Sequence, residues 1–213
     1  MDVRDATLDA SPWVPRGAAL GDLRRAACAC RGCDLWRDAT QTVFGEGPPG
    51  ASLMLIGEQP GDREDREGSP FVGPAGRMLD LALEAVGLRR DEIYVTNAVK
   101  HFRHEERGKK RIHRKPTLAH LRACEPWVRE EISAVRPAVL GLLGATAARA
   151  ILGRDVRIGD HRGAVEPTPF GPPAVITAHP SSIVRERDAE RREEAFAALV
   201  ADLQVAAITA QRV

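Results

Sequence analysis

From residue 51 onward, short apolar runs alternate with longer segments whose apolar residues recur at helical spacing, and this alternation constrains the fold most. The apolar runs are residues 52–56, 92–98, 138–143 and 174–178. The helical segments are residues 75–86, 117–135 (with a break at Pro126), 145–152 and 188–207. Strands that alternate with helices are typical of a parallel sheet with right-handed crossovers. The sequence therefore predicts an α/β fold: a three-layer α/β/α sandwich around a mainly parallel, four-stranded sheet.

Composition and length set the broad class. The 213 residues suffice for one core, which we place in a single domain over residues 22–213. Residues 1–21 contain two prolines and two glycines among few apolar positions, and we expect a loosely docked arm. The formal charge of +1 means that a nucleic-acid partner would need a local basic patch. No apolar run reaches the roughly 18 residues of a membrane span, and the early acids do not fit a secretory signal, so we expect a cytoplasmic monomer without membrane contact.

The predicted strand ends carry polar residues. In such sheets, ligands bind beyond the carboxyl ends of the strands. The first strand leads into a Gly- and Pro-containing turn that presents Glu58, Gln59 and Asp62. The alternative is that this segment is simply a turn that leads from the strand into a loop. Asn97 ends the second strand, where its one donor and one acceptor group match the edge of uracil, although it could also be an ordinary capping residue. His179, held by the following Pro180, is well placed to donate a hydrogen bond to charge developing on a ligand.

Phe71 lies in a Gly- and Pro-rich segment, residues 68–76, just before a helix. Aromatic residues make up only 4% of the chain, and Phe71 in such a loop is a poor core residue. We expect its ring to stack on a flat ligand. The amides of Gly73 and Gly76, at the helix start, could hold a phosphate or an oxyanion.

Residues 103–115 form a basic segment, RHEERGKKRIHRK. It contains seven Lys or Arg and two Glu, a local charge of +5 with neutral histidines. Only Ile112 is apolar, so we predict a loop, for which a solvated charge run is the ordinary explanation. Its cationic surroundings lower the pKa of His113, which would leave that ring neutral and nucleophilic.

Three of the four cysteines, Cys28, Cys30 and Cys33, lie within six residues, and the fourth is Cys124. In a reducing compartment such clustering favours metal or redox chemistry over disulfides. Cys30 and Cys33 form a C-x-x-C motif, and a proline follows shortly after Cys124, a context typical of iron–sulfur ligands. Structural zinc is the competing assignment, and the fourth ligand would be Cys28 or a histidine.

Four separated motifs, GEQPGDREDREGSPFVGPAGRMLD, YVTNAVKH, LLGATAA and AHPSS, resemble the iron–sulfur uracil-DNA glycosylases of the family-4 kind. The resemblance runs from about residue 28 to residue 205. The segment KKRIH is similar to the signature loop of the UdgX group in that superfamily, which links itself covalently to DNA.

The resemblance implies roles for the residues at the strand ends. Glu58 and Gln59 would lie in the catalytic pocket, with Asp62 nearby and Gln59 also against uracil. Phe71 would stack on flipped uracil and Asn97 would read its edge, while His179 would stabilise the departing uracil anion. His113 would form the bond to C1′ of deoxyribose. The substrate would be uracil-containing DNA, preferentially single-stranded, with its phosphates on Lys109, Lys110, Arg111 and Ser181.

The resemblance also implies a [4Fe–4S] cluster held by Cys30, Cys33 and Cys124. Ordinary family-4 enzymes have a cysteine directly after the N-x-V-K stretch, where this chain has His101. We expect His101 as the fourth ligand, with Cys28 as the alternative. Two other functions stay open: a family-4 glycosylase that turns over, and a non-catalytic iron–sulfur or zinc module that binds DNA.

Overall fold

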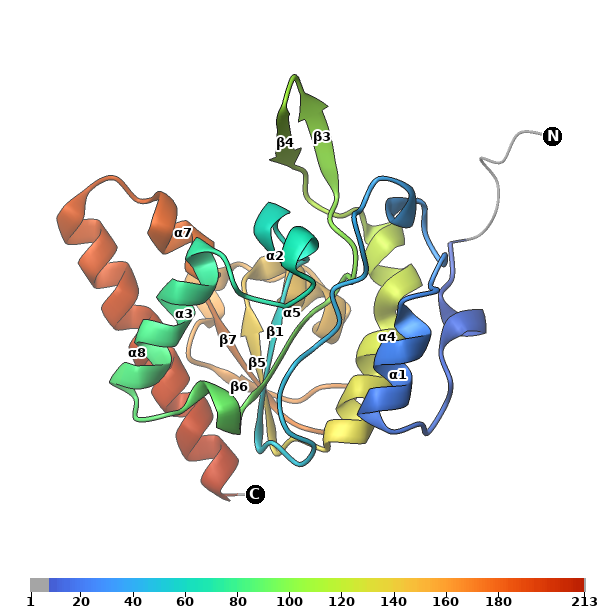
Figure 1. Cartoon of the computed structure of the whole chain (residues 1–213). Coiled ribbons are helices and arrows are strands. Elements are labelled where there is room, and N and C mark those ends of the chain that lie inside the picture. The colour runs from blue at the N-terminus through green and yellow to red at the C-terminus, as the bar shows by residue number, and fades with distance from the viewer. Residues whose placement is uncertain (1–7, 213) are drawn as a thin grey trace.

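A computed structural model describes residues 8–212 and places a five-stranded sheet at the centre of the molecule (Figure 1). The strand order is β2 (Tyr94–Asn97), β1 (Leu53–Gly57), β5 (Val139–Leu143), β7 (Ala174–Thr177) and β6 (Val165–Glu166). The first four are parallel, and β6 is antiparallel to β7. The predicted α/β fold with a mainly parallel sheet is confirmed. The count of four strands is wrong, because β6 has only two residues and no apolar run of its own.

Helices cover both faces of the sheet (Figure 1). On one face lie α1 (Leu20–Ala27), α4 (Leu118–Val135) and α5 (Ala145–Leu152); on the other lie α3 (Pro74–Ala85), α7 (Pro180–Arg185) and α8 (Ala189–Arg212). Side chains alternate between the two faces along each strand. In β1, Met54 and Ile56 belong to the first apolar cluster, and Leu53 and Leu55 belong to the second.

The basic segment is a β-hairpin and not the loop that we predicted. It consists of β3 (His104–Arg107) and β4 (Lys110–His113), joined by a turn in which Gly108 has a φ of 59°. The two strands pair only with each other and project above the sheet (Figure 1). Neither strand has a buried face, so the sequence lacks the apolar alternation that marks a strand.

Other short elements also escaped the sequence analysis. These are α1, α2 (Asp62–Glu67), α6 (Ile158–His161), α7 and the 3₁₀ helices η2 (Ser11–Trp13), η3 (Asp34–Arg37) and η4 (Arg90–Glu92). The predicted break at Pro126 is wrong, because α4 runs through it without interruption. The missing N–H costs one helical hydrogen bond, and the fully buried Trp127 and Val128 hold the helix in place at that point.

The expected N-terminal arm makes specific contacts where the structure describes it, from residue 8 onward. Ala10 is buried, and its N–H donates to the carbonyl of Ala123 in α4 at 3.0 Å. A Cβ added to Gly32 would lie 2.4 Å from the Cα of Ala10, so the two backbones touch. This part is therefore packed rather than loosely docked, while residues 1–7 lie outside the described residues. No helix within residues 8–212 is both long enough and apolar enough to cross a bilayer.

A buried ion pair joins the segment that follows β2 to α4. Lys100 and Glu131 are both fully buried, and the ammonium of Lys100 donates to Glu131, to Thr96 Oγ1 at 2.6 Å and to the carbonyl of Asn97 at 2.8 Å. Glu131 Oε1 accepts the hydroxyl of Tyr94 at 2.9 Å. Burial and the charge of Glu131 raise the pKa of Tyr94, so its hydroxyl stays protonated and donates. The network fixes the backbone of β2 where that strand ends.

Replacing Lys100 with Met should lower the free energy of unfolding by about 3 kcal/mol or more, because it leaves the buried carboxylate of Glu131 without its cation. Urea denaturation followed by circular dichroism measures the change. Lys109→Met is the matched control, because Lys109 is exposed and its loss should change stability by no more than about 0.5 kcal/mol. Equal stability of the two variants would contradict the role assigned to the pair.

Candidate active site

A cavity of about 650 Å³ lies at the carboxyl ends of the parallel strands. The predicted site residues that line it are Glu58, Gln59, Phe71, Asn97, His113, His179 and Ser181. They come from the ends of β1 and β2, the loop before α3, the hairpin, and the connection from β7 to α7. The sheet thus brings together residues that are up to 123 positions apart in sequence (Glu58 to Ser181).

Gly57, the last residue of β1, lets two of these side chains approach each other. It is paired with Asn97 of β2, and an added Cβ would lie 2.4 Å from Asn97 Oδ1 and 2.6 Å from Phe71 Cζ. Phe71 has a φ of 57°, an unfavourable backbone conformation for a bulky residue. Its side chain is only 6% exposed and packs in the apolar cluster with Leu79 and Leu83. Phe71 is therefore a core residue, contrary to our expectation, and its ring also forms part of the cavity wall.

His179 caps the start of α7. Its Nδ1 accepts the backbone N–H of Ser181 at 3.1 Å and lies 2.9 Å from the Ser181 hydroxyl. Burial, followed by the nearby charges of Arg185 and His113, lowers the pKa of His179 to about 4. The ring is thus neutral at physiological pH. Because Nδ1 accepts a hydrogen bond, the proton of the neutral ring is on Nε2, which is left as a donor.

The side chain of Gln59 clamps the base of the hairpin. Its amide nitrogen donates to the carbonyls of Arg103 (3.2 Å) and Arg114 (3.1 Å), and its oxygen accepts the N–H of Arg103 at 3.2 Å. The N–H of Arg114 also donates to the carbonyl of Arg103 at 2.9 Å, which closes the base. Gln59 is buried, and both the nitrogen and the oxygen of its side-chain amide bond to the hairpin base.

His113, the last residue of β4, meets Glu58 at the cavity. Its Nε2 lies 3.4 Å from Glu58 Oε1, and its side chain is 47% exposed, against 15% for Glu58. Burial is the main cause of a lowered pKa for His113; Arg185 and Lys115 act in the same direction, and Glu58 opposes them. The hydroxyl of Thr146 in α5 donates to the other oxygen of Glu58. The sequence analysis did not identify Thr146.

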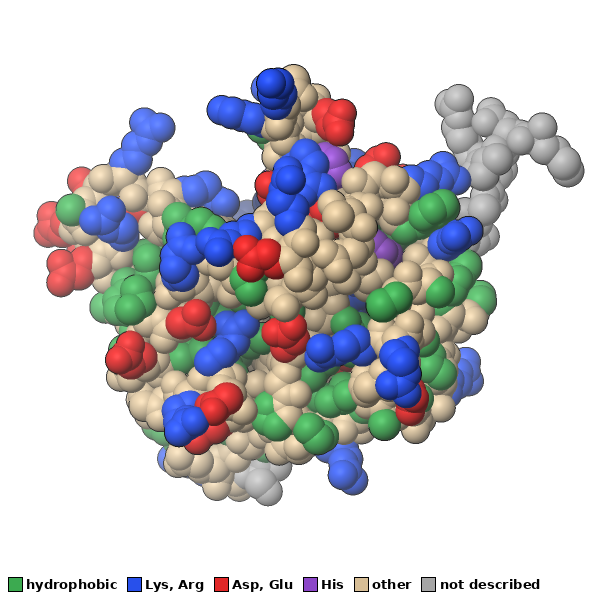
Figure 2. All heavy atoms as spheres, viewed as in Figure 1, with side chains coloured by type: hydrophobic (Ala, Val, Ile, Leu, Met, Phe, Trp, Pro, Cys, Tyr) green, Lys and Arg blue, Asp and Glu red, His purple; other side chains and the backbone are tan. Residues whose placement is uncertain are grey.

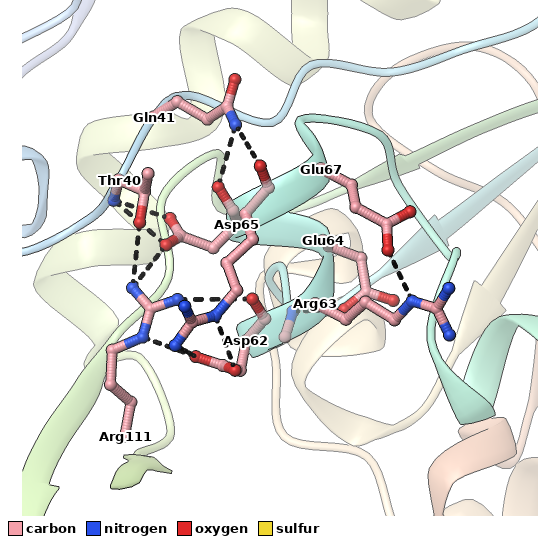
Figure 3. Close-up of polar contacts among 10 residues, drawn as sticks. Thr40, Gln41, Asp62, Arg63, Glu64, Asp65, Glu67 and Arg111 are labelled. Carbon is pink, nitrogen blue, oxygen red and sulfur yellow. Dashed lines mark hydrogen bonds and ion pairs between the residues drawn. The ribbon is translucent and has the colours of Figure 1, made fainter. Parts of the chain in front are cut away.

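Asp62 and Arg111 do not line the cavity. Arg111 Nε donates to Asp62 Oδ1 at 2.5 Å and its Nη1 donates to Asp65 Oδ2 at 2.7 Å, as Figure 3 shows. Asp65 is fully buried and also accepts the N–H of Thr40. Burial acts to raise the pKa of Asp62, but hydrogen bonds from Arg66 and Arg111 outweigh it and lower that pKa. Arg111 thus ties the hairpin to α2, and its guanidinium is engaged rather than free for phosphate.

Basic side chains are spread over the hairpin and the adjoining upper surface (Figure 2). Lys109 and Lys110 lie exposed at the hairpin turn, outside the cavity lining. Lys115 and Arg185, which we did not single out, are exposed residues that line the cavity; one lies at the base of the hairpin and the other at the end of α7. Nothing in the local sequence distinguishes Arg185 from other surface arginines.

Glu64 of α2 is a further residue that the sequence analysis missed. Its carboxylate accepts the N–H of Gly73 at 2.8 Å and that of Gly61 at 3.1 Å. Glu64 thereby ties the loop after β1 to the loop that carries Phe71. The expectation of an anion site at Gly73 is wrong, because a carboxylate of the chain itself occupies that amide.

Cys30, Cys33 and Cys124 are buried in one apolar cluster. Burial raises the pKa of Cys33 to about 11 and that of Cys124 to about 12, and Trp127 Nε1 donates to Cys30 Sγ at 3.2 Å. Three buried thiols in one cluster are a donor set that suits an iron–sulfur group or zinc. Within the described part of the chain, however, no three Cys, His, Asp or Glu side chains are arranged to hold a metal ion together.

His101 and Cys28, the two candidates for a fourth ligand, differ in environment. Burial lowers the pKa of His101 to about 4, so its ring is neutral. Thr42 Oγ1 donates its proton to the carbonyl of Ala27, so at 2.9 Å it accepts from His101 Nε2, and the lone pair of the ring lies on Nδ1. Cys28 is exposed, and its thiol contacts the carbonyl of Arg24 at 3.5 Å. Of the two candidates, His101 is the buried one, like the three thiols.

Comparison with known proteins agrees with this geometry. A sequence profile described as the Uracil DNA glycosylase superfamily matches residues 44–204, about three quarters of the chain. The chain belongs to this superfamily. The match spans every residue that lines the cavity and the whole hairpin.

Relatives with assigned names include several type-4 uracil-DNA glycosylases. That of Thermotoga maritima is 35% identical over 164 residues, which cover 76% of this chain and 82% of the relative. Those of Sulfurisphaera tokodaii and Archaeoglobus fulgidus are 34% and 37% identical over 64% and 62% of this chain. The chain spans 59% and 63% of the lengths of these last two proteins.

Replacing Arg111 with Gln should loosen the hairpin, because it removes the charged hydrogen bonds to α2. Hydrogen exchange of the amides in residues 104–113 should become about tenfold faster or more, since hydrogen bonds to charged groups are worth ~1.5–3 kcal/mol. Mass spectrometry of peptides from this segment measures the rates. Arg107→Gln is the control, because the one ion pair of Arg107 within residues 8–212 is with the exposed Glu105. Unchanged exchange in Arg111→Gln would show that Arg111 does not anchor the hairpin.

Proposed function

We propose that the chain is a uracil-DNA glycosylase that excises uracil from DNA and then becomes linked through His113 to C1′ of the abasic deoxyribose. The observation that carries the proposal is the position of His113, whose Nε2 lies 3.4 Å from Glu58 in the cavity that also contains Phe71, Asn97 and His179. The type-4 names of the relatives support base excision. The similarity of residues 109–113 to the UdgX loop supports the covalent step.

Binding requires the uracil nucleotide to leave the base stack. The flipped base would lie against the ring of Phe71, and the side-chain amide of Asn97 would read its polar edge. Exposed Lys109, Lys110 and Lys115, together with Ser181, would contact phosphates, which makes binding sensitive to salt but not to sequence.

Bond cleavage separates charge, and the cavity offers a partner for each charge. The bond between C1′ and N1 breaks, and its electron pair leaves with uracil. The Nε2–H of neutral His179 would donate to the uracil anion, and the carboxylate of Glu58 would stabilise the oxocarbenium sugar.

His113 then completes the reaction. A nitrogen of its neutral ring donates its lone pair to C1′, and an imidazolium forms beside Glu58. The ring then loses its remaining N–H proton to solvent. The adduct persists because an unprotonated imidazole is a poor leaving group, so each molecule would react once.

The buried thiols would hold a [4Fe–4S] cluster, with Cys30, Cys33, Cys124 and His101 as its ligands. Such a cluster would act as a structural link. It would join the segment after α1 to the start of the hairpin region and to α4. His101 lies one residue before Phe102, whose ring centroid is 6.0 Å from that of His113, so the link would also support the attacking residue.

The covalent step is tested with a uracil-containing single-stranded oligonucleotide, followed by boiling in SDS and denaturing electrophoresis. The wild-type protein should give a retarded band that is absent with thymine. His113→Ser should give no band and should instead release free uracil and leave an abasic product. His104→Ser is the matched control, because His104 pairs with His113 across the hairpin but does not line the cavity, and it should retain the band.

Two outcomes would overturn this mechanism. Free uracil with many turnovers from the wild-type protein would make it a conventional family-4 glycosylase. Tight binding without base release would leave a non-catalytic module that binds DNA.

The ligand set is tested by metal analysis of purified variants. Cys28→Ala should keep the wild-type iron content, because the side chain of Cys28 is exposed, whereas the other three thiols are buried. His101→Ala should lose most of the iron, and His101→Cys should retain it. Iron loss in Cys28→Ala alone would identify Cys28 as the fourth ligand. Zinc in place of iron would contradict the iron–sulfur cluster.

A further inference from the structure

We infer that Thr146 is a positioning residue, whose hydroxyl holds the carboxylate of Glu58 in the orientation that serves His113. The inference rests on the function proposed above and adds a residue to it. Thr146 is the second residue of α5 and lies two positions after Gly144, the N-cap of that helix. Its hydroxyl donates to Glu58 Oε2, while Glu58 Oε1 faces His113 Nε2 at 3.4 Å.

These three side chains come from three separate parts of the fold. Thr146 is on α5, Glu58 follows β1, and His113 ends the hairpin. All three line the same cavity. Glu58 therefore bridges the rigid α/β body and the added hairpin, and each of its two carboxylate oxygens faces one of them.

Glu58 needs such a restraint because its own side chain has three rotatable bonds. Within residues 8–212, no other group donates a hydrogen bond to its carboxylate. Thr146, in contrast, is β-branched and lies in a helix, where its side chain is stiff. The start of α5 is itself held in place, because a Cβ added to Gly144 would lie 2.9 Å from the Cβ of His179.

The hydrogen bond also divides the two oxygens of the carboxylate between two partners. A hydroxyl has one proton to donate, and Thr146 directs it at Oε2, which leaves Oε1 for His113. Thr146 makes and breaks no covalent bond and keeps its proton throughout.

The position of Glu58 would decide whether His113 or water captures C1′. With Glu58 held in place, the imidazolium that forms on His113 has its counter-charge already oriented. Without the hydroxyl, the carboxylate turns away. Uracil release slows only in part, because His179 still serves the departing base, whereas attack by His113 slows further. Some oxocarbenium is then captured by water and ends as a free abasic site.

The test compares wild type, Thr146→Val and Thr146→Ser by rapid quench with a labelled uracil-containing single strand. Two products are measured in the same samples: the SDS-resistant adduct and the free uracil. Thr146→Val keeps the shape and branching but lacks the hydroxyl. It should form the adduct about tenfold more slowly or worse, as expected for a lost hydrogen bond to a charged group, and with less than one adduct per uracil released. Thr146→Ser should restore both the rate and the ratio.

A matched control is Thr209→Val, because the hydroxyl of Thr209 donates to the backbone carbonyl of Val205 within α8, away from the cavity lining. It should behave as wild type. Equilibrium binding to a thymine-containing strand should agree within about threefold for all variants, which verifies that they are folded.

Three results would count against the inference. A wild-type rate and ratio in Thr146→Val would overturn it while leaving the proposed function intact. Failure of Thr146→Ser to restore the ratio would show that the hydroxyl is not the active feature. Absence of any adduct from the wild-type protein would instead overturn the proposed covalent function, and the positioning role with it.

Discussion

The site depends on the end of β1, a strand that lies between two parallel neighbours and finishes in a residue without a side chain. Gly57 is in register with Asn97, and the space that its Cβ would fill is taken by the Asn97 amide and the Phe71 ring. Any other residue at this position would push one of them away. The next two residues, Glu58 and Gln59, then reach the hairpin. One strand end therefore connects the groups proposed to bind the base with those proposed to act on the sugar.

The hairpin has little apolar support of its own, and its position is determined by polar contacts with the body of the protein. Gln59 bonds to the backbone on both sides of its base, and Arg111 ties its second strand to Asp62 and Asp65 of α2. The local charge of +5 therefore does not act as one phosphate-binding surface. Part of it is neutralised inside the protein, and the exposed lysines are left at the turn and at the base.

The parts of the fold with a regular apolar pattern could be predicted from the sequence. The four parallel strands and the helices α3, α4, α5 and α8 each bury a continuous face, which produces that pattern. The hairpin, β6, α2 and α7 bury too little to produce one. Among site residues, Asn97 and His179 were predictable because strand ends collect ligand-binding groups. The roles of Gln59, Asp62, Arg111 and Thr146 depend on partners between 44 and 88 positions away in sequence. No local pattern encodes such distant partners.

The closed base of the hairpin has a consequence for how such a protein could arise. The chain leaves the body at Arg103 and returns at Arg114, where the two backbones are already joined by a hydrogen bond of 2.9 Å. Among the described residues, β3 and β4 form backbone ladders only with each other, so removal of residues 104–113 would take no strand from the central sheet and neither Phe71 nor Asn97 from the cavity. A single insertion or deletion at this point could therefore add or remove His113 in one step. The residues proposed to bind the base and the residue proposed to react with the sugar would then be encoded by separable segments of one gene.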